Sequence, residues 1–148
     1  MTDFAGAVGA IKQRLRDHWT ATPILFENEE PPAEITAGGV PWVECAVLAD
    51  LAEQRSIGSP GSNLLVDEGA IEITVFVPAG TGTEIAHQHA VGIADIFRNQ
   101  NFYRDGQGRQ VMTTMPLIGR GSRAESESPS GTWWAVAVTT PFQFYRLG

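Results

Sequence analysis

Residues 70–102, AIEITVFVPAGTGTEIAHQHAVGIADIFRNQNF, contain the pattern on which the fold depends. Between Ala70 and Val77 the side chains alternate with a period of two, which predicts a half-buried strand. Pro78 ends this strand, because proline has no N–H to donate to a ladder. After a glycine-rich turn, apolar residues recur every three or four positions, and this stripe predicts an amphipathic helix that packs through Ile85, Ala86, His89, Ala90, Ile93, Ile96 and Phe97.

The glycine-rich turn, Gly80-Thr81-Gly82-Thr83, permits two interpretations. Helix N-termini attract anions, so the turn is a possible phosphate site. A Walker loop, however, needs GxxxxGK[S/T], and the turn contains no lysine. The third glycine of a GxGxxG loop is missing too, since Ile85 stands at its position. The sequence favours a plain strand-to-helix turn in which Thr81 or Thr83 caps the helix.

Together with this unit, the other patterns indicate one α+β domain over residues 1–148. We expect a mixed, mostly antiparallel sheet, two main helices packed on one face, and a long β-hairpin arm. The first helix is predicted over residues 3–19, with Thr2 or Asp3 as its cap. Further strands are predicted at residues 24–26, 40–50, 111–115 and 132–145. Pro141 indicates a bulge or an edge near the end of the last strand.

Three segments are expected outside the regular sheet. Residues 27–39 (ENEEPPAEITAGG) are acidic and rich in proline, which is typical of a surface loop. Residues 120–131 (RGSRAESESPSG) are polar and low in complexity, so we expect a mobile segment. Residues 55–67 are predicted to form the hairpin arm, with its tip at residues 58–63. A partner-binding arm and a disordered surface loop both remain open for this tip.

The composition limits the possible functions. The chain has 148 residues, 43% of them hydrophobic, which is enough for a core of its own. Its net charge of -7 argues against direct DNA binding, because a stable nucleic-acid surface needs clustered Lys and Arg. No apolar run approaches a membrane span of about 20 residues, and the start lacks the pattern of a signal peptide. The single cysteine, Cys45, excludes an internal disulfide and fits a reducing compartment.

No catalytic, cofactor or metal site is expected. His87 and His89 are two residues apart on a helix, so they point to different faces and cannot share a metal ion. Cys45 lies in the middle of a strand, where a buried and inert thiol is the usual case. The carboxylate pairs lie in polar segments, where solvated charges are expected, at Glu29 with Glu30 and at Glu125 with Glu127.

The aromatic residues of the last strand raise the question of subunit contacts. Because side chains alternate along a strand, Trp133 and Trp134 must point to opposite faces. One of them can enter the core, and the other must be covered by a helix, a loop or another subunit. Core packing and a subunit interface are therefore both open.

Four stretches occur in a characteristic order: HWTATPILFEN (18–28), PWVECAV (41–47), TVFVPAGTGTEIAHQHAVGIADIFR (74–98) and WWAVAVTTPFQFY (133–145). In order and spacing, these stretches resemble the tail terminator, or tail completion, proteins of long-tailed bacteriophages and of phage-like gene transfer particles. The most specific parts are the Trp19-x-x-Thr22-Pro23-Ile24 turn with Glu27-Asn28, and the Pro78-x-Gly80-x-Gly82 turn. The likeness covers nearly the whole chain.

The resemblance implies a structural protein of the virion, not an enzyme. Such proteins form a hexameric ring on the last ring of the tail tube protein, stop its polymerisation and present a surface to the head completion or connector protein. DNA then passes through the lumen without specific binding. The implied location is the head–tail junction after assembly in the host cytoplasm, with no cofactor and no membrane.

Two alternatives to this function remain open. The first is another head–tail connector, or a minor tail or tube protein. The second is a small nucleotide-binding module or enzyme that uses the loop of Gly80 and Gly82. Because the family fixes few residues by identity, interface candidates are chosen by element, from the hairpin at residues 55–67 and the segment at residues 120–130, with one strand aromatic added: Arg55, Ile57, Leu64, Leu65, Arg120, Arg123 and Trp134.

Overall fold

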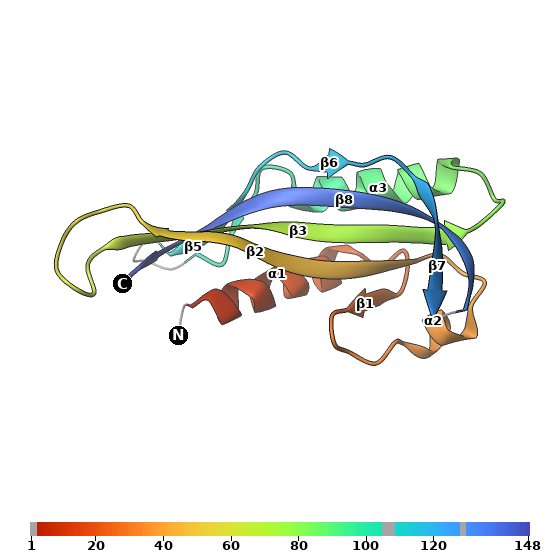
Figure 1. Cartoon of the computed structure of the whole chain (residues 1–148), viewed down its shortest axis with the longest axis horizontal. Helices are drawn as coiled ribbons and strands as arrows, with labels where there is room; N and C mark the ends of the chain where they lie inside the picture. Colours follow the sequence, from red (N-terminus) through yellow and green to blue (C-terminus); the bar gives the residue numbers. More distant parts are fainter. Residues whose placement is uncertain (1–2, 105–108, 128–129) are drawn as a thin grey trace.

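A long, curled sheet runs the length of the molecule in this computed structural model, which describes residues 3–104, 109–127 and 130–148 (Figure 1). The strand order is β1-β2-β3-β8-β5-β4, and β6 and β7 also pair with β8. Strand β1 runs parallel to β2, and the other paired strands are antiparallel. The bounds are β1 (Ile24–Phe26), β2 (Trp42–Gln54), β3 (Leu64–Pro78), β4 (Asn101–Phe102), β5 (Gln110–Thr113), β6 (Leu117–Ile118), β7 (Ser122–Glu127) and β8 (Ser130–Leu147). This confirms the predicted α+β class with a mixed, mostly antiparallel sheet.

Two helices, α1 (Phe4–His18) and α3 (Glu84–Phe97), share one hydrophobic core with one face of the sheet, which we call the inner face. Asp3 caps α1, since its carboxylate accepts the Gly6 N–H at 2.8 Å. Across the inner face, Val43, Val75 and Val136 stand side by side on β2, β3 and β8, all fully buried. Burying each such side chain stabilises the fold by roughly 1.5–3 kcal/mol.

The predicted helix after the glycine-rich turn is present, and its buried residues include Ala86, Ala90, Ile93 and Phe97. Ile85, predicted to pack with them, is 46% exposed in the first turn. The predicted threonine cap is wrong. Thr83 occupies the cap position without a side-chain hydrogen bond, and the Thr81 hydroxyl donates to the Pro78 carbonyl at 2.7 Å. That bond closes the turn on the strand, which leaves the helix N-terminus uncapped by either threonine.

A β-bulge bends the sheet where β2 and β3 leave the core. Ala49 pairs with Gly69 and Leu51 with Glu68, so Asp50 is the extra residue on β2. A Cβ atom added to Gly69 would lie 2.1 Å from the Leu48 carbonyl oxygen. Gly69 is therefore required by the close approach of two backbones, and the Phe142 ring covers it from β8.

Two segments predicted to be irregular contain short regular elements. Residues 27–39 contain α2 (Ala33–Ala37), whose Ile35 is fully buried beside Trp42 and Trp133. The segment predicted to be mobile contains β7, which pairs with the start of β8. The sequence did not predict these two elements, because the local composition is polar and their contacts come from distant strands. The predicted turn at Asp105 and Gly106 lies outside the described residues.

Pro141 lies within β8, and the register with β3 runs through it without a shift. On the opposite side, its carbonyl accepts the Thr114 N–H at 3.1 Å, between the segments where β5 and β6 pair with β8. Because the N–H and C=O of one residue point to the same side of an antiparallel strand, the missing donor faces this break. The proline thus marks an interruption of the neighbouring strand, not a bulge.

Candidate assembly interface

The hairpin tip is longer than predicted and comprises residues 55–63, between β2 and β3, which project beyond the helices at one end of the sheet (Figure 1). Ile57 is fully exposed, at 103% of its reference area. The loop is tied at its base, because Asn63 and Gly148 exchange two backbone hydrogen bonds of 2.9 Å. The tip thus carries a large apolar side chain at a fixed place, and a partner surface is what would remove that side chain from water.

The base of the hairpin holds a polar network. The Arg55 guanidinium donates to Glu53 at 2.6 Å and to Glu68 at 2.8 Å, and the Gln143 amide also donates to Glu68. These bonds raise the pKa of Arg55, with the hydrogen bond to Glu53 as the largest cause. Arg55, predicted as a contact residue, is therefore engaged within the chain and positions the hairpin. Leu64 and Leu65 are half-buried at the start of β3.

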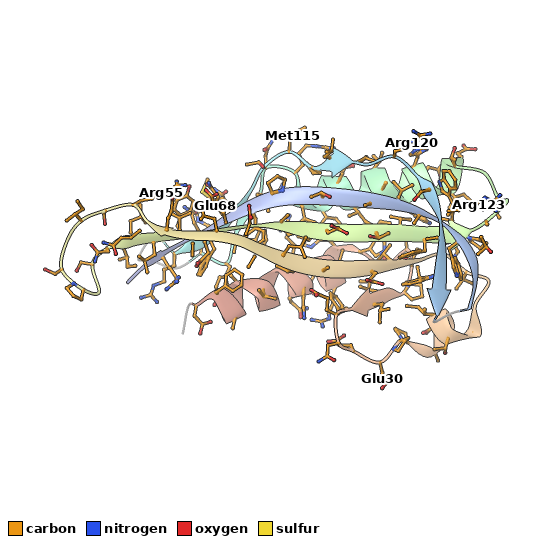
Figure 2. The ribbon with its side chains drawn as sticks, viewed as in Figure 1. Glu30, Arg55, Glu68, Met115, Arg120 and Arg123 are labelled. Atoms are coloured by element: carbon orange, nitrogen blue, oxygen red, sulfur yellow. The ribbon has the colours of Figure 1, made fainter. Side chains whose placement is uncertain are left out.

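The other candidates lie at the opposite end of the sheet. Both Arg120, just before β7, and Arg123, within β7, are exposed (Figure 2). Trp134 is half-buried against the main core, and its buried indole N–H has no hydrogen-bond partner in the described part of the chain. Trp133 points to the opposite face, as predicted, and is buried beside Trp42 and Ile35. The structure thus separates the seven candidates into a hairpin group and a β7 group.

The glycine-rich turn lines a shallow depression of about 210 Å³. Its walls include Arg123 and Trp134 together with Gly80, Gly82 and Thr83. Both glycines have φ of +86°, in the left-handed region that favours glycine, which explains why the turn needs them. The turn therefore has a structural reason for its composition.

The two parts of the stretch noted in the sequence, the Trp19-x-x-Thr22-Pro23-Ile24 turn and Glu27-Asn28, also have structural roles. The Trp19 indole N–H donates to the Thr22 hydroxyl at 2.9 Å, and Thr22 in turn donates to the Pro23 carbonyl, which fixes the exit from α1. The Glu27 carboxylate accepts the Val47 N–H on the free side of β2 at 2.9 Å. The motif thus joins α1, β1 and the edge of the sheet.

The titratable groups of the core include one thiol and one imidazole. Cys45 is fully buried, as predicted, and burial raises the pKa of its thiol to about 12. His89 is half-buried with its ring 5.5 Å from that of Trp19, and burial lowers its pKa. Among the described residues, no three His, Cys, Asp or Glu side chains gather as a metal-binding group would require.

Sequence reasoning missed one pair of residues as a candidate site. Glu44 on β2 and Glu72 on β3 lie on the face of the sheet opposite α1 and α3, which we call the outer face. Burial raises the pKa of Glu44, with smaller contributions from Glu27 and Glu72. The alternation in both strands already placed these side chains away from Val43 and Ile73. Their proximity, however, depends on the register between the strands.

No helix in the described part of the chain is long and apolar enough to cross a membrane.

Within residues 3–104, 109–127 and 130–148, the sheet leaves an edge open on each side. Strand β1 pairs with β2 at Val43, Glu44 and Cys45, so β3 is the only described partner of the far half of β2. At the other side, β8 is the only described partner of β7. Open edges of this kind are templates for pairing with another chain.

Comparison with known families identifies the family of the chain. A family model described as phage tail terminator protein matches residues 8–142. The chain belongs to the phage tail terminator family. This family consists of structural proteins, so this tail terminator is a structural component of a phage-type virion tail.

A solved structure supports the same fold. It aligns over 97% of this tail terminator and 96% of its own chain, with a TM-score of 0.63. The sequences are 19% identical, so this likeness concerns the fold alone. No curated protein matches the chain.

Proposed function

We propose that this tail terminator forms a ring that caps the tail tube, ends its polymerisation and joins the tail to the head. The match to the tail terminator family over residues 8–142 is the observation that carries the proposal. We expect six copies in the ring, because the resemblance to the family implies a hexamer. The ring would act by its geometry, without a cofactor or a catalytic step.

The open edges and the exposed tip support assembly with copies and partners. Strands β2 and β7 form opposite margins of one sheet, so neighbouring copies in a ring can cover both margins. Ile57 stands at the end of the projecting loop, where it can reach a neighbour or the tail tube protein. The net charge of -7 suits a ring through which DNA passes without sticking. Assembly is proposed to take place in the host cytoplasm, in a phage or a gene transfer particle.

The test is electron microscopy of particles from a producer in which this gene is deleted. Overlong tails without heads are expected, because the tube lacks both its cap and its surface for the head. Headless tails of normal length would show a connector role without termination. Full heads with normal attached tails would refute the proposal, and binding of nucleotide to the loop of Gly80 and Gly82 would then be measured by thermal shift.

A further inference from the structure

Most of the outer face of the sheet is left uncovered by the described residues. At one end, α2 and the buried pair Trp42 and Trp133 close it. Beyond that end the face carries small, half-exposed residues of β2, β3 and β8, and at its margins stand Leu48 and Leu117, with 45% and 70% of their areas exposed. A face of small side chains allows another surface to approach closely.

The centre of this face holds two adjacent acidic side chains. Glu44 is opposite Thr74 and Glu72 is opposite Ala46, so the two carboxylates lie diagonally across neighbouring strands. Both residues are half-buried, and no described residue gives either carboxylate a hydrogen bond or an ion pair. Two like charges in a half-buried place are unfavourable until a cation joins them.

The same chain carries unpaired cations on another surface. Arg120 and Arg123 are exposed, and neither has a hydrogen bond, ion pair or ring contact among the described residues. We call the segment from Arg120 to Arg123 the basic rim. Arg123 is opposite Trp134, whose ring packs on the inner-face core, so the Arg123 side chain belongs to that side of the sheet. Within one rigid sheet, Arg123 therefore cannot reach Glu44 or Glu72 on the outer face.

We propose that the outer face of one copy receives the basic rim of a second copy, where Arg120 and Arg123 pair with Glu44 and Glu72. This inference rests on the proposed function, since it names the contact between ring neighbours. Because the two surfaces are different parts of one chain, the contact is head-to-tail, which is the kind that closes into a ring. It also supplies cations to the uncompensated carboxylates and covers the open edge of β7.

A charge-swap series tests the contact in the deletion producer, complemented with the full-length chain. Glu72→Arg and Arg123→Glu, each alone, are expected to reduce the fraction of tails with normal length and attached heads at least tenfold. The double variant carrying both changes is expected to restore that fraction, because the exchanged charges attract again. Glu30→Arg and Arg104→Glu make the same charge changes elsewhere on the exposed surface and serve as matched controls.

Each other outcome has a definite meaning. If the double variant is no better than the single ones, or if the single ones behave as the wild type does, the contact is refuted. If the single variants give tails of normal length whose attached heads lose their DNA, the contact is also refuted, and the acidic face lies in the lumen. Glu72→Gln and Arg123→Gln replace the reversals if the melting temperature of a purified reversal variant falls. With these neutral variants the contact predicts that the double variant is no worse than either single one, and additive losses would refute it. Normal tails in the uncomplemented deletion producer would refute the proposed function itself, which separates the two failures.

Discussion

At the scale of single residues, Gly69 shows a position where glycine is required by space. A methyl group there would meet the Leu48 carbonyl and the Phe142 ring. Gly69→Ala is therefore expected to lower the free energy of unfolding by about 1–3 kcal/mol. Gly9→Ala is the matched control, because nothing lies within 4 Å of that methyl group on the exposed side of α1. It should raise stability by roughly 1 kcal/mol.

Both glycine variants are measured by denaturant unfolding of the purified protein. Equal effects of the two substitutions would contradict the close approach at the bulge.

Glu44 predicts a dependence of stability on pH. Burial, Glu27 and Glu72 raise its pKa in the folded state, so the folded protein binds this proton more tightly than the unfolded chain. Its contribution to stability therefore falls as the pH rises through the raised pKa. Glu44→Gln removes this penalty and should raise the melting temperature at pH 7, with a smaller gain below about pH 4.3.

The measurement compares the melting temperatures of dilute wild-type and variant protein at pH 4 and at pH 7. Glu30→Gln, at an exposed position, serves as the control. A shift for Glu44→Gln that is the same at pH 4 and pH 7 would show that the charge is not the cause.

At the scale of elements, the two faces of α3 differ in their tolerance of a charged substitution. Ile93 is fully buried against the sheet, whereas Val91 is 49% exposed. Ile93→Asp places an unpaired charge in the core and should abolish cooperative folding, at a cost above about 4 kcal/mol. Val91→Asp introduces the same side chain on the same helix and should change stability by less than about 1 kcal/mol. Soluble yield and circular dichroism melting distinguish the two, and a stable Ile93→Asp variant would place the buried face elsewhere.

The hairpin tip is expected to act in assembly and not in folding. Ile57→Ser removes a fully exposed apolar side chain, so the melting temperature should stay within error of the wild type. The fraction of capped tails in the complemented deletion producer should fall. Val40→Ser, at a position 43% exposed near the other end of the sheet, is the control. Normal capping with Ile57→Ser would remove the tip from the list of assembly contacts.

Periodic elements could be predicted from the sequence, and elements held by distant contacts could not. The alternation in β3 and the apolar stripe of α3 are local signals with many repeats. Helix α2, in contrast, has five residues and one buried side chain, Ile35, whose partners Trp42 and Trp133 come from β2 and β8. Strand β7 is polar and shows no apolar alternation, so only its pairing with β8 reveals it.

The candidate interface residues divide in the same way, into those that local sequence identifies and those whose contacts depend on distant strands. Ile57 was chosen from the loop around it, and it is fully exposed. Arg55 was also chosen, but its ion pairs with Glu53 and Glu68 form only when the two strands of the hairpin align. The pair of Glu44 and Glu72 depends on the register between β2 and β3 in the same way.

At the scale of the whole molecule, β3 and β8 join almost every other element. They pair with each other over fifteen positions, from Leu64 with Leu147 to Pro78 with Trp133. We therefore expect residues 1–148 to unfold as one domain in a single transition. Tryptophan fluorescence and far-ultraviolet circular dichroism should give coincident melting curves. Two separated transitions would show that one end of the sheet unfolds independently.

The last residue of this chain and the start of α1 both lie beside the base of the hairpin. Gly148 is bonded to Asn63, and Phe4 lines the same depression as Asp50, Ala52 and Asp67 at the hairpin base (Figure 1). An affinity tag or fluorescent fusion after Gly148 would therefore stand at the base of the hairpin loop and obstruct the surface that the tip offers. Reconstitution of rings calls for protein from which the tag has been cleaved. A fluorophore attached to the last residue would, for the same reason, report directly when the tip meets its partner.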